Sequence, residues 1–306
     1  MARLTLLLPA LSRFAGQALP DALGRALACA NRSRREAGEV AQLMRHLRPL
    51  PARWPQAALT RLLDAGEDDA RAAQWLRADP AHIRPDINGA RLLGIGRNLG
   101  IEQTDVDALL PALRPLFGDA GFVLDAPHPQ RWYLRLPRGS AVPEFASPDA
   151  ALGDDVFQHR AEGPDARRWR VLESEVQIAL HNHPHNATRL EHGRVAINAL
   201  WFWGGGVLPD SLASTAVTVF SDDPVVQGAA LLGTLACMPL ADVQPSTANA
   251  LVDLRHQRDV GRLLQEWLLP ACAEDAQFDF ADGTLFTLTR GQRWRFWRRP
   301  LTRLTA

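Results

Sequence analysis

The apolar positions along the 306-residue chain follow two periods, one typical of buried strands and one typical of amphipathic helices. Short apolar runs predict strands at 4–11, 91–95, 122–125, 131–136, 195–203, 216–220, 250–254, 278–280 and 285–288. Apolar residues three and four positions apart predict helices at 18–29, 54–63, 68–77, 104–116, 168–179, 225–238 and 259–269. Strands that alternate with helices predict an α/β protein with a mixed, mostly parallel sheet and helices on both faces.

A β-α-β-β order within residues 81–138 predicts a small inserted α+β subdomain. The main domain is then expected at 1–80 and 139–306. Asp282-Gly283 predicts a hairpin turn between the last two strands. The basic aromatic tail, 290–300, is expected as an edge strand with Trp294 and Phe296 turned inward and its arginines in solvent.

Residues 181–209 hold the densest run of special residues in the chain. Pro184 ends the preceding helix, and Asn186 is expected to cap a short helix that Gly193 stops. Residues 195–203 are expected to form a buried parallel strand. Gly204, Gly205 and Gly206 are expected to form a tight loop where backbone approaches a ligand closely.

A small anionic ligand, a phosphate or a carboxylate, is expected over this glycine loop. Arg189 is its expected charged anchor because a guanidinium binds such groups through a fork of donors. The other expected contacts are Asn186, Asn198 and Trp203. Two alternatives stay open: Arg189 bonds helix-end carbonyls or a carboxylate, and the asparagines are structural. His181, His183 and His185 are expected as a polar turn, with a metal site as the alternative.

The same stretch resembles a segment of archaeal-type cofactor-independent phosphoglycerate mutases, which belong to the alkaline phosphatase superfamily. The positions that match are Asn186, Arg189, Gly193, Asn198, Trp201, Trp203, Gly204, Gly206 and Pro209. The whole chain resembles, more closely, the related bacterial proteins called regulatory protein, RpfE type. The resemblance implies an alkaline-phosphatase-like fold and a regulatory setting.

The superfamily's chemistry implies a Ser or Thr nucleophile beside two divalent metals held by Asp and His residues. Here the first strand ends without a carboxylate, and Thr289-Arg290-Gly291-Gln292 stands where a late Asp-His pair is implied. Asp253, His256 and Asp259 are left as one weak candidate ion site. We therefore expect no catalytic residues, no metal and no cofactor, and a regulatory or ligand-sensing pseudoenzyme. The alternatives are a metal-dependent mutase or phosphatase with atypical ligands, and a protein- or nucleic-acid-binding module that uses the basic aromatic tail.

The amino-acid composition limits the classes of partner and of chemistry that we expect for this protein. All 34 basic side chains are arginine and balance 34 acidic ones, so no net field attracts nucleic acid or anionic lipid. Without lysine, Schiff-base and P-loop chemistry are excluded. The three isolated cysteines favour buried thiols in a reducing cytoplasm. No apolar run reaches the length of a membrane span, so neither a membrane nor a nucleic acid is the expected partner, whereas a protein partner stays open.

Overall fold

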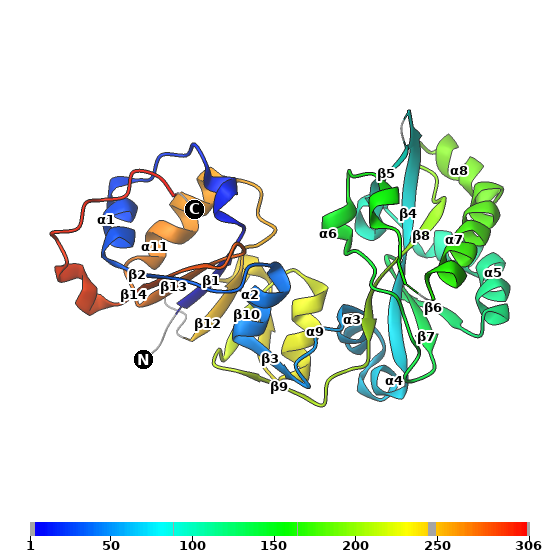
Figure 1. The fold of residues 1–306 in the computed structure, drawn as a ribbon, viewed down its shortest axis with the longest axis horizontal. Helices are drawn as coiled ribbons and strands as arrows, with labels where there is room; N and C mark the ends of the chain where they lie inside the picture. Colours follow the sequence, from blue (N-terminus) through cyan, green and yellow to red (C-terminus); the bar gives the residue numbers. More distant parts are fainter. Residues whose placement is uncertain (1–3, 88, 164, 244–248, 305–306) are drawn as a thin grey trace. The chain divides into compact units, whose positions relative to one another are not determined.

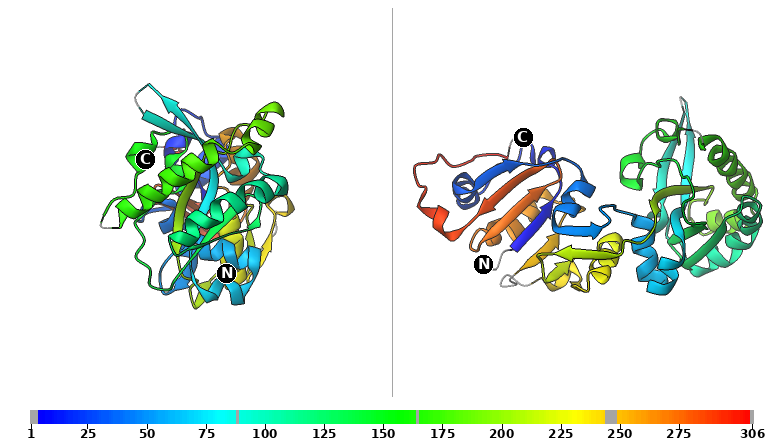
Figure 2. Two further views of the ribbon diagram at one scale, coloured as in Figure 1. Left: turned by 90° about the vertical axis from the view of Figure 1, so that its right-hand side faces the viewer. Right: turned by 60° about the horizontal axis from the view of Figure 1, so that its bottom comes forward.

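The computed structural model describes residues 4–87, 89–163, 165–243 and 249–304. Contacts between residues divide the chain into two compact units, which Figures 1 and 2 show. Unit 1 comprises residues 1–53 and 209–306, and unit 2 comprises residues 54–208. These boundaries differ from the expected ones, because the expected insert, 81–138, lies wholly inside unit 2 and its first boundary cuts a continuous strand.

Unit 1 contains the predicted mixed, mostly parallel sheet. Its strand order is β11-β10-β12-β1-β13-β14-β2, in which the first five strands are parallel and β14 is antiparallel to both neighbours. The strands are β1 (Leu4–Leu8), β2 (Asn31–Arg34), β10 (Thr218–Phe220), β11 (Ala236–Met238), β12 (Ala250–Asp253), β13 (Ala276–Phe280) and β14 (Thr284–Leu288). A separate pair joins β3 (Leu47–Leu50) to β9 (Ser211–Ser214).

Helices cover both faces of this sheet (Figure 1). Leu6, Leu8 and Val252 face a core shared with α1 (Asp21–Cys29) and with a helix that runs from α10 (Val260–Arg262) through a π-helical turn (Leu263–Leu268) to α11 (Leu269–Ala271). Strand side chains alternate, so the intervening positions point to the face that carries α2 (Glu39–His46) and α9 (Pro224–Leu232). The predicted α/β class is therefore confirmed. Short 3-10 helices lie at Leu11–Phe14, Leu240–Asp242 and Arg290–Trp294.

Unit 2 is built around an antiparallel sheet of order β5-β4-β7-β6, with β8 paired to the other side of β4. The strands are β4 (Gln74–Asp86), β5 (Gly89–Ile95), β6 (Val123–His128), β7 (Arg131–Leu136) and β8 (Ala199–Gly206). One face packs apolar side chains against α5 (Gln103–Asp119) and α7 (Ala166–His181). The remaining helices are α3 (Gln56–Ala65), α4 (Glu67–Ala72), α6 (Pro148–Ala151) and α8 (His185–Glu191), with 3-10 turns at Gly96–Leu99 and Val156–His159.

Several predicted elements differ from the structure. The predicted parallel strand 195–203 is β8, which is antiparallel to β4, and the three glycines expected as a loop are its last residues. The helix predicted at 68–77 ends at Ala72, because β4 begins at Gln74. The helix predicted at 225–238 ends at Leu232, and the missed strand β11 follows. The helix predicted at 104–116 is α5, which contains Pro111 and continues to Asp119.

The tail also departs from its prediction. Residues 290–294 form a 3-10 helix and not a strand. Trp294 and Phe296, expected inward, are 77% and 84% exposed. The reason lies in Arg295 between them and Arg298 after them, which bond backbone oxygens at the end of α1 and leave the aromatic rings in solvent. Cys237, expected to be buried, is exposed.

In the parts of the chain that the structure describes, no helix combines the length and the apolar character needed to cross a membrane.

Candidate functional site

The carboxyl edge of the parallel sheet in unit 1 gathers acidic side chains from three strands. Asp253 is the last residue of β12, Asp279 lies near the end of β13, and Asp223 follows β10. In open α/β sheets this edge is where ligands usually bind, because the loops after parallel strands meet there. Asp253 and Asp279 are buried and Asp223 is 17% exposed, so the first two negative charges in particular require a compensating group.

Arg255 supplies that group for two of the carboxylates. Its Nε and Nη2 donate to Oδ1 and Oδ2 of Asp253 at 2.8 Å each, and its Nη2 also donates to Asp223 Oδ2 at 2.9 Å. Glu39 Oε2 lies 3.5 Å from Nη1. The Ser221 hydroxyl donates to Asp253 Oδ2 at 2.9 Å, so both oxygens of that carboxylate are engaged. The guanidinium is buried and therefore acts as a fixed cation within the fold.

Asp279 is compensated in the same way by neighbouring residues of α2. Arg45 donates to its two oxygens at 2.9 Å and 2.7 Å, and His46 Nε2 lies 2.7 Å from Oδ2. The buried Gln42 side chain donates to the backbone carbonyls of Leu8 and Asp279 and so ties α2 to the ends of β1 and β13. At this sheet edge, the buried carboxylates are therefore paired with the guanidiniums of Arg255 and Arg45.

The charge balance at this edge shifts two pKa values. Burial alone raises the pKa of Asp223, but the hydrogen bond from His256 and the charge of Arg255 outweigh it and hold that pKa at about 2. The hydrogen bond to Asp223 raises the pKa of His256 above its ordinary value. Both shifts stabilise the charged forms of the pair.

The low pKa of Asp223 predicts an acid-dependent stability. A folded-state pKa of about 2, below the ordinary 3.8, means that this contribution is complete above 3.8 and is lost as the pH falls toward 2. We expect Asp223→Asn to lower stability at neutral pH by about 1–3 kcal/mol and to flatten this acid limb. Urea unfolding of both proteins at a series of acidic pH values and at neutral pH measures the loss of stability and its dependence on pH. An unchanged acid limb in the variant would show that Asp223 does not carry it.

These residues do not fit the pair of divalent metals that the family resemblance implies. A metal ion at Asp253 requires carboxylate oxygens that are free to coordinate it, whereas both of these bond Arg255. The other members of the expected weak ion site are engaged elsewhere: Asp259 caps the next helix through the Arg262 N–H, and His256 lies 3.6 Å from Asp223. Among the described residues, no group of three or more His, Cys, Asp or Glu side chains is arranged to hold a metal ion.

The expected ligand anchor Arg189 is buried in unit 2 with its donors engaged. Its Nη1 donates to Asp105 Oδ2 at 2.6 Å, its Nη2 to the Leu99 carbonyl at 2.8 Å and its Nε to the Val195 carbonyl at 3.0 Å. His185 Nε2 lies 2.7 Å from the other oxygen of Asp105. These contacts match the structural alternative, in which Arg189 fastens α8 to the start of α5. Ligand binding by Arg189 stays a prediction.

Asn186 and Asn198 also make contacts within the fold. Asn186 is not the cap that was expected, because it lies inside α8 and donates to the carbonyls of Leu180 and Ile197. It also accepts from the Ile197 N–H at 2.8 Å. The Asn198 side chain accepts a hydrogen bond from the Ile83 N–H and donates one to the Ile83 carbonyl. Both side chains therefore hold the approach to β8 in place, and a ligand contact by either stays a prediction.

The glycines at the end of β8 are needed for close packing. A Cβ on Gly204 would lie 2.9 Å from Gln56 Cβ, and one on Gly206 would lie 2.7 Å from Pro55 Cβ. Gly205 is nearly as tight, 3.1 Å from a Leu76 methyl carbon. The protein itself fills the space in which a ligand was expected, so binding there stays a prediction.

The polar-turn interpretation of the three histidines agrees with their contacts. His185 bonds Asp105, and His183 Nδ1 accepts from the His185 N–H at 3.3 Å. Burial and the neighbouring His185 lower the pKa of His183, which disfavours the charged form of His183. His181 ends α7 in an exposed position.

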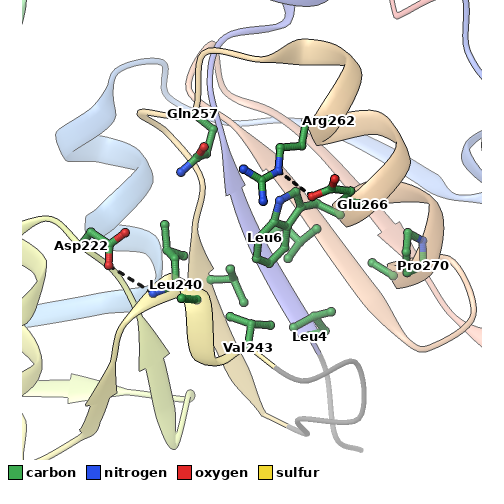
Figure 3. Close-up of a pocket in the computed structure, with 13 residues that line it drawn as sticks. Leu4, Leu6, Asp222, Leu240, Val243, Gln257, Arg262, Glu266 and Pro270 are labelled. Atoms are coloured by element: carbon green, nitrogen blue, oxygen red, sulfur yellow. Dashed lines mark hydrogen bonds and ion pairs between the residues drawn. The ribbon is translucent and has the colours of Figure 1, made fainter.

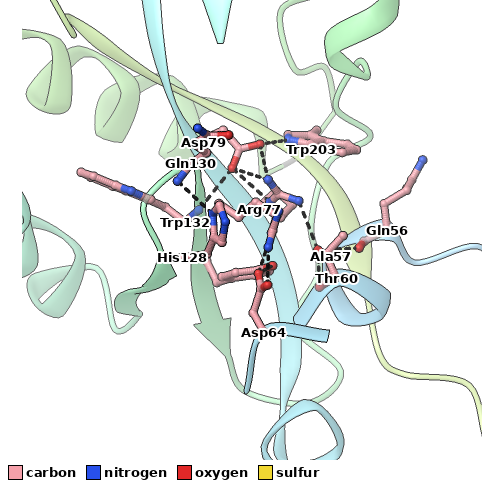
Figure 4. A network of polar contacts seen from close by, with 12 residues as sticks. Gln56, Ala57, Thr60, Asp64, Arg77, Asp79, His128, Gln130, Trp132 and Trp203 are labelled. Carbon is pink, nitrogen blue, oxygen red and sulfur yellow. Dashed lines mark hydrogen bonds and ion pairs between the residues drawn. The ribbon is translucent and has the colours of Figure 1, made fainter. Parts of the chain in front are cut away.

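A buried polar network, which no pattern in the sequence predicts, lies on the other face of the unit 2 sheet (Figure 4). Arg77 donates from Nε and Nη2 to both oxygens of Asp79, and Trp203 Nε1 donates to Asp79 Oδ2 at 2.7 Å. Arg77 Nη1 reaches Thr60 on α3 at 3.1 Å. The Tyr133 hydroxyl donates to Asp64, also on α3, and burial raises the pKa of that hydroxyl. The network fastens α3 to the sheet and gives Trp203 a structural partner.

A cavity of about 420 Å³ opens in unit 1 between β1, β12 and the π-helical turn (Figure 3). Leu4, Leu6 and Val252 form its apolar floor, and Arg262 and Glu266 form an ion pair of 2.6 Å beside it. Turns of π-helix often lie at functional sites. The cavity shares no residue with the ligand site expected from the sequence.

Part of the chain is similar in sequence to a known protein. No family model matches the chain. Over 119 residues it is 29% identical to a probable 2,3-bisphosphoglycerate-independent phosphoglycerate mutase of Geobacter sulfurreducens. The match covers 39% of this chain and only 30% of that protein. It supports the relationship to cofactor-independent phosphoglycerate mutases that the sequence motif indicates.

Two solved structures are similar over most of the chain. A cofactor-independent phosphoglycerate mutase of Thermoplasma acidophilum is 15% identical, with 95% of this chain and 90% of that one covered and a TM-score of 0.43. The PH0037 protein of Pyrococcus horikoshii is 11% identical, with 98% and 90% covered and a TM-score of 0.45.

Proposed function

We propose that this protein is a phosphoglycerate-mutase-related regulatory or ligand-sensing protein that does not carry out metal-dependent phosphoryl transfer. The observation that carries the proposal is the guanidinium of Arg255, which takes both oxygens of Asp253 at the carboxyl edge of the sheet. A metal ion at that carboxylate would have to expel a buried arginine that also bonds Asp223.

The proposal also covers the type of regulatory protein, its cellular location and the site of the sensed ligand. The resemblance of the whole chain supports a place among bacterial regulatory proteins of the RpfE type, and the three isolated cysteines favour the cytoplasm. For a sensed ligand we favour the cavity of unit 1, because it offers an apolar floor with the Arg262 guanidinium beside it as a partner for a phosphate or carboxylate.

Assays on the purified wild-type protein test the proposal. We expect no interconversion of 2- and 3-phosphoglycerate with added manganese, and no manganese or zinc in stoichiometric amounts after gel filtration. An active cofactor-independent phosphoglycerate mutase, treated identically, is the positive control. Manganese-dependent turnover that disappears in Asp253→Ala would refute the proposal and favour a mutase with atypical ligands.

A further inference from the structure

The C-terminal segment inverts the usual arrangement of apolar and charged side chains. Trp294, Phe296 and Trp297, which we call the aromatic tip, are 77%, 84% and 69% exposed. Arg295, which lies between them, and Arg298, which follows them, are directed toward the protein. Large aromatic side chains grouped on a surface mark interaction sites more often than isolated ones do.

The aromatic tip is held in place by specific bonds. Arg295 Nη1 donates to the Cys29 carbonyl at 3.0 Å and to Asn31 Oδ1 at 2.6 Å. Arg298 Nη1 donates to the carbonyls of Ala28 and Ala30 at 3.1 Å and 3.0 Å, at the end of α1. The 3-10 helix before the tip begins with a capping box between Thr289 and Gln292. The outward direction of the rings is therefore built into the fold.

The surroundings of the tip are strongly positive, although the whole chain is neutral. Residues 283–306 contain six arginines and neither aspartate nor glutamate, and one of the six, Arg290, pairs with Glu274 at 2.6 Å. The acceptors of Arg295 and Arg298 are uncharged carbonyl and amide oxygens, so those bonds leave both positive charges uncompensated. Arg299 and Arg303 are exposed. A partner that complements this surface must be negatively charged and must also accept aromatic side chains.

We propose that the aromatic tip is a peripheral contact site for an anionic lipid surface. Tryptophan and phenylalanine enter the interfacial region of a bilayer, and adjacent arginines gain from the negative lipid headgroups. Such a contact needs no spanning segment, so it is compatible with the absence of a long apolar run. This proposal for the aromatic tip does not depend on the proposed loss of metal-dependent phosphoryl transfer.

Single-stranded nucleic acid fits the same charges but fits the geometry less well. Phe296 and Trp297 meet edge to face, with ring centroids 5.7 Å apart and planes at 77°. Successive bases stack on ring faces that follow a basic groove. Here the guanidiniums of Arg295 and Arg298 are directed at the end of α1 and do not line such a groove.

Sedimentation of the full-length protein with vesicles tests the proposal. We expect binding to vesicles that contain phosphatidylserine, weaker binding at high salt, and little binding to pure phosphatidylcholine. Replacing Trp294, Phe296 and Trp297 together with serine should reduce the bound fraction by about tenfold or more, since each large apolar side chain favours the apolar phase. Arg299→Gln with Arg303→Gln should reduce it by several-fold.

Matched controls lie on unit 2, where Ile178 and Arg167 are likewise exposed. Ile178→Ser and Arg167→Gln should leave vesicle binding unchanged. Circular dichroism should show that the triple serine variant is folded, because its three side chains are already in solvent. Equal sedimentation of this variant and the wild type would overturn the proposal. So would binding to oligodeoxythymidylate without binding to vesicles, which would assign the tip to nucleic acid.

Discussion

Arg255→Ala is expected to destabilise unit 1 by about 3–5 kcal/mol and to lower its unfolding temperature by roughly 10 °C. The substitution leaves Asp253 buried with only the Ser221 hydroxyl as a side-chain partner, and it removes one of the two cations beside Asp223. Differential scanning calorimetry measures the loss. Arg258→Ala is the matched control, because Arg258 is exposed three positions further along the chain.

The same variant tests the proposal that the Arg255 guanidinium prevents metal binding at this sheet edge. The substitution frees the oxygens of Asp253 and Asp223 that bond the guanidinium, and carboxylate and imidazole groups such as these and His256 are ligands for manganese or zinc. We expect added manganese to raise the unfolding temperature of Arg255→Ala and to leave the wild type unchanged. Wild-type stability equal to that of the variant, or manganese stabilisation of the wild type alone, would contradict the role given to Arg255.

Arg189→Ala is expected to cost unit 2 a similar amount, about 3–5 kcal/mol. Asp105 would keep His185 but lose its buried cation, and the carbonyls of Leu99 and Val195 would lose their donors. Arg194→Ala is the control, because the Arg194–Glu102 pair is exposed on both sides and is worth only about 0–1 kcal/mol.

This experiment also separates the two interpretations of Arg189. A structural role predicts a lower unfolding temperature with unchanged binding of inorganic phosphate, measured by calorimetric titration. A fall in phosphate affinity of roughly tenfold at unchanged stability would instead restore Arg189 as a ligand anchor.

Unit 2 illustrates where sequence patterns mislead. The centre of its sheet is β4, but residues 68–77, which include the start of this strand, were predicted as a helix. Arg77 and Asp79 are charged, which argues against a buried strand, and Pro80 cannot donate to a ladder. The two charged side chains can be buried because Arg77 donates hydrogen bonds to Asp79, and Asp79 also accepts one from Trp203. The signal that could have found β4 is the alternation of Leu76 and Ala78 with polar neighbours.

The close spacing of the glycines after Trp203 was likewise ambiguous. Three successive glycines indicate that backbone approaches something closely, but they do not say whether that neighbour is a ligand or another part of the chain. In the structure the neighbours are Pro55, Gln56 and Leu76, more than a hundred residues away in sequence. Only the packing of α3 and β4 against β8 resolves the question.

The amino-acid sequence by itself determined the class of the fold, the parallel strands at β1, β10 and β12, and the closing hairpin, because periodicity and turn residues act locally. It also indicated the similarity to cofactor-independent phosphoglycerate mutases, which the 29% identity over 119 residues supports. The tertiary structure alone decided which charges meet. Asp253, Asp223 and Glu39 come from three distant segments, and their common partner Arg255 is two residues from only one of them. Such compensation depends on distances of a few ångströms between groups that the chain separates, and no local pattern records it.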